Sequence, residues 1–298
     1  MATAYSQKDS NVRKTWFIMF GFFIMIILIG WAFSWIYQSP VILYIAVGFS
    51  IAMNFFSYWY SDKIVLKMTS AQPISRETHR DLWNITENLC IATGLPMPKI
   101  YLIDDKAPNA FATGRNQDNA VVAVTSGLLE SLDRNELEGV VAHELAHIQN
   151  RDILLMTVVV VLVGFITLLS DFFLRSLLFG GGGNRDGRAQ LTMILVGVAL
   201  AILSPIVAIV IKMAVSRRRE FLADASGALM TRYPEGLASA LEKISSYSMP
   251  MRKANNAMAH MYISNPFGVK GKKMGFLNRM FMTHPPVEER IKALRNNK

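Results

Sequence analysis

Val141-Ala-His-Glu-Leu-Ala-His147 is the stretch around which the chain is organised. It lies within residues 133–152, where apolar residues recur at helical spacing. On a helix, His143 and His147 lie one turn apart on the same face, so both imidazoles can bind one zinc ion. Glu144 follows the first histidine directly, and the H-E-x-x-H pattern uses that glutamate as the general base for an attacking water.

A catalytic zinc site needs a third protein ligand and one open position. A metzincin has glycine and histidine where this chain has Asn150 and Ile153, which excludes that class. A thermolysin-like (gluzincin) site takes a glutamate from a second helix, and Glu220 in Arg219-Glu-Phe-Leu-Ala-Asp224 is the best candidate. Asp224, one turn later, is expected to accept a hydrogen bond from a zinc-binding histidine, with the third ligand as its alternative role. A solvated helix face is the alternative for both acidic residues.

Composition indicates membrane spans beside one soluble domain. Of the 298 residues, 52% are apolar and 18% are charged, and the charged share is below the roughly 25% of soluble domains. Cys90 is the only cysteine, so an internal disulfide is excluded and a reducing compartment fits. The net charge of +9 comes without a nucleic-acid-reading motif. Positive charge beside membrane spans explains it more simply, and no nucleic-acid partner is expected.

Four apolar runs predict membrane helices, at residues 16–37, 41–60, 153–174 and 191–215. The first covers about 33 Å as a helix, enough for a bilayer core. Its connection to the second, Gln38-Ser-Pro40, carries no Lys or Arg, whereas both outer flanks are basic, so both ends of this hairpin are placed in the cytoplasm. The basic cluster Arg217-Arg-Arg219 places the end of the fourth run there as well. A re-entrant hairpin is the alternative for the third and fourth runs.

The remaining residues predict a small α+β domain. Asp133 with Glu136 reads as a capped start of the motif helix, and the other expected elements are helices at 75–93, 233–246 and 287–294 and strands at 99–103, 109–113 and 120–125. The fold class is therefore a mainly α integral membrane protein with four transmembrane helices and a gluzincin-like α+β zinc protease domain. The expected parts are a first hairpin at 1–60, a first domain part at 61–152, a second hairpin at 153–215 and a second domain part at 216–298.

Two segments are candidates for substrate contact. Asn109-Ala-Phe111 is expected to form an edge strand that pairs with an extended substrate, with a plain structural turn as the alternative. Residues 249–282 are rich in methionine, which suits adaptable apolar contacts. A lid near the membrane and a loosely packed surface segment are both open for this stretch.

The motifs together resemble the HtpX family, bacterial membrane-bound zinc metalloproteases related to the CAAX prenyl endopeptidases. The matching stretches are Pro108-Asn-Ala-Phe-Ala-Thr-Gly114, Val141–His147, Arg219–Asp224 and Thr283-His-Pro-Pro286. The resemblance implies one zinc ion per chain, with His143, His147 and Glu220 as ligands and Glu144 as the catalytic residue. It also implies a multi-pass protein of the bacterial inner membrane whose protease domain faces the cytoplasm. Its implied role is quality control under stress, by cleaving misfolded or damaged membrane proteins, with self-cleavage a risk.

His284 is the candidate donor to the oxyanion that develops during peptide hydrolysis. Pro285 and Pro286 restrict its backbone and begin a helix, and the resemblance places it near the site. Of the other histidines outside the motif, His79 is expected to face solvent and His260 lies in the methionine-rich stretch. A helix-start residue with only a capping role is the alternative for His284.

Two other functions remain open. A prenyl-protein peptidase would use the same chemistry, but the four apolar runs are fewer than its large chamber needs. A non-enzymatic membrane scaffold would hold a structural zinc with four protein ligands, usually rich in cysteine. Cys90 lies outside the motif, which disfavours the scaffold.

Overall fold

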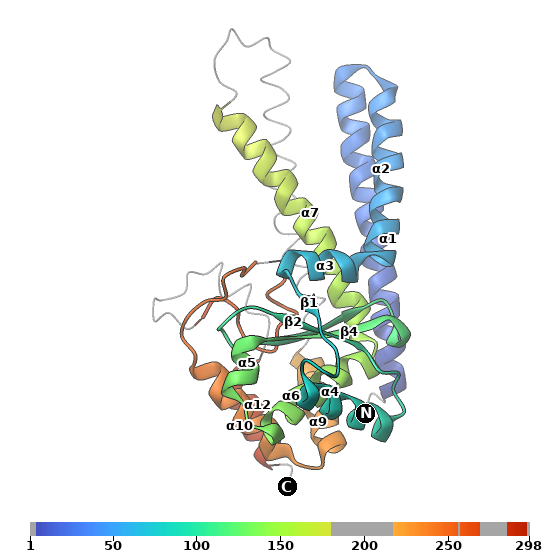
Figure 1. Cartoon of the computed structure of the whole chain (residues 1–298). Coiled ribbons are helices and arrows are strands. Elements are labelled where there is room, and N and C mark those ends of the chain that lie inside the picture. Colours follow the sequence, from blue (N-terminus) through green and yellow to red (C-terminus); the bar gives the residue numbers. More distant parts are fainter. Residues whose placement is uncertain (1–3, 180–216, 256, 269–284, 297–298) are drawn as a thin grey trace.

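A computed structural model of the chain describes residues 4–179, 217–255, 257–268 and 285–296. Two long helices stand side by side above a domain in which helices surround a small sheet, and a third long helix rises next to them (Figure 1). The described part is mostly helical with a small mixed sheet, which confirms the coarse prediction from the sequence.

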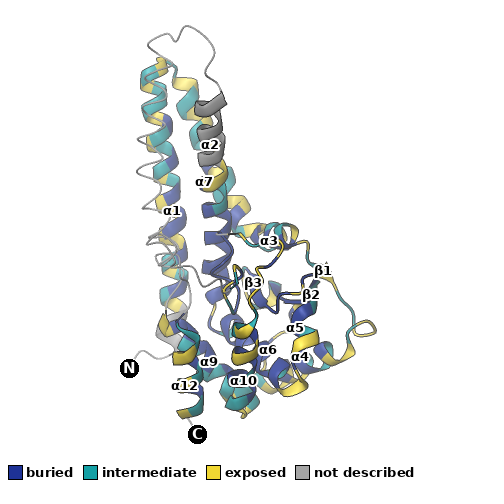
Figure 2. Ribbon diagram, turned by 90° about the vertical axis from the view of Figure 1, so that its left-hand side faces the viewer, coloured by how far each residue is buried: buried dark blue, intermediate teal, exposed yellow. Residues whose placement is uncertain are grey.

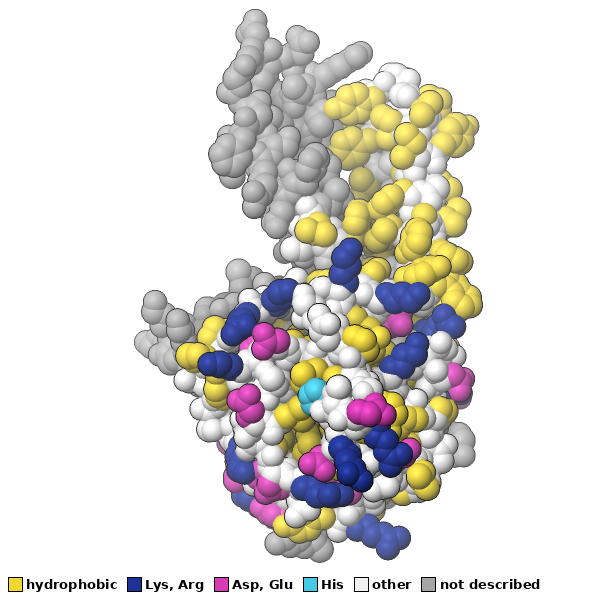
Figure 3. Space-filling view, in the orientation of Figure 1, with side chains coloured by type: hydrophobic (Ala, Val, Ile, Leu, Met, Phe, Trp, Pro, Cys, Tyr) yellow, Lys and Arg dark blue, Asp and Glu magenta, His cyan; other side chains and the backbone are white. Residues whose placement is uncertain are grey.

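The two N-terminal helices are long and apolar enough to cross a membrane. They are α1 (Ala4–Tyr37) and α2 (Pro40–Trp59), and they correspond to the first two apolar runs. Their outer surface is covered by aromatic and aliphatic side chains, among them Trp31, Trp35 and Tyr44, seen as the yellow column in Figure 3. An apolar surface of this extent is unusual on a soluble monomer and fits a membrane protein.

The third long helix, α7 (Asp152–Phe179), leaves the domain where α6 (Arg134–Gln149) ends. The two axes are bent by 86°, and the pair is apolar enough to be a broken span or a re-entrant loop. Arg151 makes this corner with a positive φ of 56°. The lower part of α7 is buried (Figure 2). The fourth predicted span, 191–215, lies outside the described residues.

The sheet has the strand order β1-β2-β4-β3, with β1 (Gln72–Pro73), β2 (Lys99–Ile103), β3 (Ala110–Gly114) and β4 (Ala120–Thr125). β4 runs parallel to β2 and antiparallel to β3. All six residues of β4 are buried, as expected for a central strand covered on both faces. β3 is an outer strand of the sheet and contacts both α6 and α7.

Alternating side chains of the sheet pack into two separate cores. Ala112 and Val122 point into the larger core, which the helices below the sheet complete. Phe111 and Ala123 point into the core on the membrane side, together with side chains of α7. The helices of the domain are α3 (Ser61–Thr69), α4 (Arg80–Thr93), α5 (Ser126–Ser131), α6, α9 (Arg217–Thr231), α10 (Pro234–Ser246) and α12 (Val287–Asn296), with a short 3₁₀ turn, η1 (Gln117–Asn119).

The methionine-rich stretch contributes to the membrane-side core. Met251, Met258 and Met261 are buried beside Phe111 and Tyr262. A loosely packed surface segment is therefore wrong for this part of the stretch, while residues 269–282 lie outside the described part of the chain.

Several element boundaries differ from those expected. The helix expected at 75–93 begins only at Arg80, and neither α3 nor β1 was predicted. The polar N-terminal segment is helical from Ala4, so α1 runs past the end of its apolar part and down beside the domain (Figure 1). The division of the chain into four parts stays a prediction.

Helix α6 is held in the centre of the domain by close backbone contacts. Asp133 and Glu136 form the predicted capping box at its start. A Cβ added at Gly139 would lie 2.6 Å from the backbone nitrogen of Leu237 in α10. One added at Gly227 of α9 would lie 3.0 Å from the backbone nitrogen of His143. Both neighbouring helices therefore approach α6 as closely as glycine permits.

Gly139→Ala tests this packing. Alanine is normally the better helix residue by about 1 kcal/mol, but here the methyl group collides with the backbone of α10. We expect a net loss of roughly 1–3 kcal/mol, as for other overpacked sites, measured by unfolding of the detergent-solubilised protein. Gly48→Ala in α2, where no described atom lies within 4 Å of the added methyl, is the matched control. An unchanged or raised stability of Gly139→Ala would contradict the close contact.

Candidate active site

The two motif histidines face each other inside the domain. Both lie on α6, and their Nε2 atoms are 3.2 Å apart. His143 is 1% exposed and His147 is 4% exposed, so bulk water does not reach either ring freely. The α-helical repeat places them on one face, and the capping box fixes where that helix begins.

Glu220 comes to these histidines from α9. Its Oε1 atom lies 3.6 Å from Nε2 of His147, and one ligand atom from each of the three residues lies within 4.8 Å of the others. Gly227, two turns further along α9, allows that helix to lie against the backbone of His143. The structure thus brings together the three residues that the sequence predicts as metal ligands.

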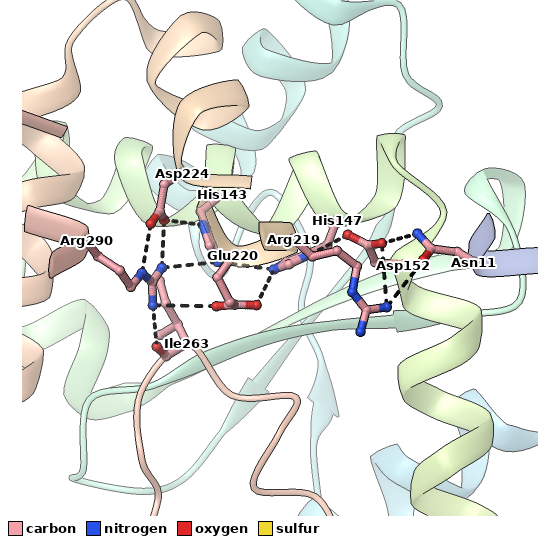
Figure 4. A network of polar contacts seen from close by, with 9 residues as sticks. All are labelled: Asn11, His143, His147, Asp152, Arg219, Glu220, Asp224, Ile263 and Arg290. Atoms are coloured by element: carbon pink, nitrogen blue, oxygen red, sulfur yellow. Dashed lines mark hydrogen bonds and ion pairs between the residues drawn. The ribbon is translucent and has the colours of Figure 1, made fainter. Parts of the chain in front are cut away.

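A carboxylate supports each histidine from behind (Figure 4). Oδ1 of Asp224 lies 2.9 Å from Nδ1 of His143. Oδ2 of Asp152 lies 3.1 Å from Nδ1 of His147. Such contacts fix the ring orientation and direct Nε2 toward a bound metal. Asp224 thus occupies the place expected of it, and Asp152 plays the same part for the second histidine.

The electrostatic surroundings of the two rings differ. Burial lowers the pKa of His143 to about 4, although Asp224 acts in the opposite direction. Burial also disfavours protonation of His147, but the hydrogen bond to Asp152 and the charge of Glu220 outweigh it and raise its pKa to about 9. His143 is therefore neutral, the form that binds metal, while the carboxylates around His147 stabilise a positive charge at that position.

The buried charges fit a divalent cation. Among the residues that the structure describes, the buried charged side chains around the histidines are four carboxylates and two guanidinium groups, namely Glu144, Asp152, Glu220, Asp224, Arg219 and Arg290. Buried carboxylates that outnumber their counter-charges cost several kcal/mol per ion. A doubly charged cation removes that imbalance. Two imidazoles and one carboxylate are also the ligand set of many catalytic zinc sites.

Glu144, which follows His143 directly on α6, is 1% exposed. Burial raises its pKa to about 7, and the nearby charge of Glu220 acts in the same direction. The backbone N–H of Ala112 in β3 donates a hydrogen bond to its carboxylate. A carboxyl group with a pKa near neutrality can both take and return a proton at physiological pH.

Asn109 lies directly before the outer strand β3, but its side chain is engaged by the chain itself. Its Nδ2 donates to the carbonyl of Ser264 at 3.0 Å, and its Oδ1 accepts from the backbone N–H of Ser264 at 3.3 Å. Next to it, the N–H of Ile263 donates to the carbonyl of Ala110 at 3.0 Å. Residues 263–264 therefore cover the part of the edge at which an extended substrate was expected.

Arg290 is a central residue that was not predicted from the sequence. It is 0% exposed and binds both carboxylate oxygens of Asp224, at 2.8 and 2.7 Å. Its Nη1 also lies 3.7 Å from Oε2 of Glu220. A signal was present, because Arg290 falls on the apolar face of the last helix with Val287 and Leu294.

His284, the expected oxyanion donor, lies outside the described residues. His260 is buried, and its Nε2 lies 3.1 Å from the carbonyl oxygen of Met156 in α7. His79 flanks the start of α4 and contacts the hydroxyl of Thr78.

Comparison with known proteins places this arrangement in a family. Residues 76–298 match peptidase family M48. The chain is 46% identical over 300 residues to a protease HtpX homolog of Caldanaerobacter subterraneus subsp. tengcongensis, covering 99% of this chain and 98% of that protein. It is 47% identical over 254 residues to one of Tropheryma whipplei, covering 85% and 84%. The fold is also similar to the crystal structure of S. mikatae Ste24p, with a TM-score of 0.50 and 18% identity, over 97% of this chain and 67% of that one.

The apolar helices and the peptidase match together define a membrane metalloprotease. More narrowly, the chain belongs to peptidase family M48 and, within it, to the HtpX homologues.

Arg290→Met tests how strongly the buried charges depend on this arginine. The substitution leaves Asp224 buried without its bidentate partner, and breaking such a pair costs about 3–5 kcal/mol. Arg295 lies on the same helix, also binds two carboxylates and is 39% exposed, so Arg295→Met is the matched control with a loss of about 0–1 kcal/mol. Both are measured as the free energy of unfolding. Similar losses of unfolding free energy for the two variants would mean that burial of the Arg290–Asp224 pair does not determine how much the pair stabilises the fold.

Proposed function

We propose that this protein is a zinc-dependent endopeptidase that cleaves misfolded or damaged membrane proteins at the cytoplasmic face of a bacterial inner membrane. The observation that carries the proposal is the buried group of His143, His147 and Glu220, with Glu144 beside it. This group lies in the domain directly below the long helices, since α6 turns into α7 within three residues. A substrate that leaves the bilayer would reach the site without crossing a soluble domain.

His143, His147 and Glu220 would hold the zinc ion. Zinc supplies a Lewis acid that polarises the peptide carbonyl and activates water near neutral pH. Glu144 takes the proton from the attacking water and returns it to the leaving amine, for which its raised pKa is suited. His284 stays the proposed oxyanion donor, a role that rests on the sequence.

The outer edge of β3, which residues 263–264 cover in part, is the proposed substrate site. An extended peptide that adds to this edge would take over the bond that Ile263 now makes to Ala110. Ala112 on the same strand donates to Glu144, so the edge and the general base are in fixed relation. Residues 263–264 must move away for the substrate to bind, which also limits unwanted cleavage of folded proteins or of the chain itself.

The similarity to Ste24p concerns the fold alone. The chain is 46% identical to a protease HtpX homolog but only 18% identical to Ste24p, so a prenyl-protein peptidase is the weaker proposal. Cleavage of a prenylated peptide and of an unfolded membrane protein by the wild type, measured side by side, separates the two proposals. Preferential cleavage of the prenylated peptide would favour the alternative.

Glu144→Gln is expected to bind zinc like the wild type but to cleave an unfolded membrane protein about 10²–10⁴-fold more slowly, because an amide cannot act as a base. Glu220→Gln is expected to lose zinc affinity instead, because it removes a charged ligand. Zinc content and cleavage rate are measured for both. Normal turnover by Glu144→Gln would overturn the assigned mechanism, and normal zinc binding by Glu220→Gln would move the third ligand elsewhere, to Asp224 first.

The proposed orientation is tested by labelling with an impermeant maleimide. Cys90 is buried and is the only cysteine, so Cys90→Ala gives a clean background. Gln38 in the α1–α2 connection and Asp118 in the turn before β4 are both exposed. Intact cells should label Gln38→Cys and spare Asp118→Cys, while permeabilised cells label both. Labelling of Asp118→Cys from outside would contradict a cytoplasmic domain.

A further inference from the structure

We propose that Asn11, which precedes the apolar part of the first span, is a positioning residue of the active site. It holds Asp152, which in turn orients His147. The inference rests on the proposed zinc site and adds to it a residue from the opposite end of the chain.

The carboxamide of Asn11 joins three segments that are distant in sequence (Figure 4). Its Nδ2 donates to Oδ1 of Asp152, and also lies 3.4 Å from the carbonyl oxygen of Asn150. Its Oδ1 accepts from Nη1 of Arg219 at 3.5 Å. Asn11 is 2% exposed, so water does not replace these contacts. One side chain thus fixes the start of α7 and the start of α9, the helix that carries Glu220.

Asp152 uses its two oxygens for different partners. Oδ2 lies 3.1 Å from Nδ1 of His147, and Oδ1 receives the amide of Asn11 with Arg219 4.0 Å away. The carboxylate therefore cannot rotate to favour one partner without losing the other. A fixed carboxylate gives a fixed imidazole, and the direction of Nε2 follows from it.

The two histidines are supported in the same way but from different elements. Behind His143, Asp224 is held by Arg290 of the last helix. Behind His147, Asp152 is held by Asn11 of the first helix and by Arg219. Removing Asn11 weakens the support that Asp152 gives to His147. It leaves the contacts between Arg290 and Asp224 in place.

Apolar packing fixes the position of Asn11 along the molecule. Asn11 and Thr15 continue the buried stripe that Ile18, Phe22 and Ile26 form on α1. This stripe packs against α7 over much of its length, and the rings of Phe22 and Phe165 meet at 6.3 Å. α1 and α7 lie against each other near the domain and diverge above it (Figure 1). The register that this packing imposes sets Asn11 opposite the first residue of α7.

The experiment compares Asn11→Leu with Thr15→Val, two nearly isosteric changes of buried polar residues on the same helix. Within the described part of the chain, the hydroxyl of Thr15 donates only to the carbonyl of Asn11 in α1, so Thr15→Val is the matched control. In the detergent-solubilised full chain, zinc affinity is measured by competition with a chelator, and kcat and KM are measured separately. We expect Asn11→Leu to lower zinc affinity about 10–100-fold, as loss of support for a ligand does. KM should change little, and Thr15→Val should resemble the wild type.

A double-mutant cycle with Asp152→Asn separates positioning from general destabilisation. If Asn11 acts through Asp152, Asn11→Leu adds little to the loss of zinc affinity that Asp152→Asn already causes. Additive losses, or a wild-type zinc affinity in Asn11→Leu, would overturn the inference. Asn11→Ser replaces Asn11→Leu in the cycle if the leucine variant does not fold. A wild-type chain that binds no zinc would overturn the proposed function and this inference together, whereas a zinc-binding wild type with an equally tight Asn11→Leu overturns the inference alone.

Discussion

The buried carboxylates around His143 and His147 require positive charge within a few ångströms. Buried arginine side chains from separate helices supply part of that charge. Glu144, Glu220 and their neighbours come from α6, α7 and α9, and each would be strongly destabilising alone in the interior. Arg219 and Arg290 provide part of the compensation, and a divalent ion fits the remainder. Each buried charge of the site therefore depends on the others to compensate the cost of its burial.

The membrane helices belong to this unit. The turn at Arg151 sends α7 away at 86° to α6, so Asp152 can reach back to His147 while the rest of α7 enters the apolar helix group. α1 packs along α7 and extends below it to Asn11. The contacts that hold the long helices to the domain therefore also hold the candidate site, which lies at the base of these helices.

Local patterns in the sequence were enough to predict many of the helices and strands and the three candidate metal ligands. β2 and β4 have the predicted bounds, and α6 begins with the predicted capping box, because strand alternation, helical spacing and caps depend on near neighbours. Contacts between distant segments were not predictable in this way. Asn11 carries no local sign of its partners 141 and 208 residues away. β1 has two residues and exists only by pairing with β2, so no periodicity marks it.

The covered edge of β3 has an energetic consequence if the protein acts on unfolded chains, as proposed. Ile263 and Ser264 make three hydrogen bonds to Ala110 and Asn109 there, each of which contributes a net of about 0.5–1.5 kcal/mol. An extended substrate offers the same kind of backbone donors and acceptors. When it displaces residues 263–264, its own hydrogen bonds to the strand replace the ones that are lost. A folded protein has already satisfied its own backbone and cannot make that exchange without first unfolding. Under the proposed function, covering the edge with the chain's own residues would favour substrates that present free backbone, which is the selectivity that the proposed quality-control role needs.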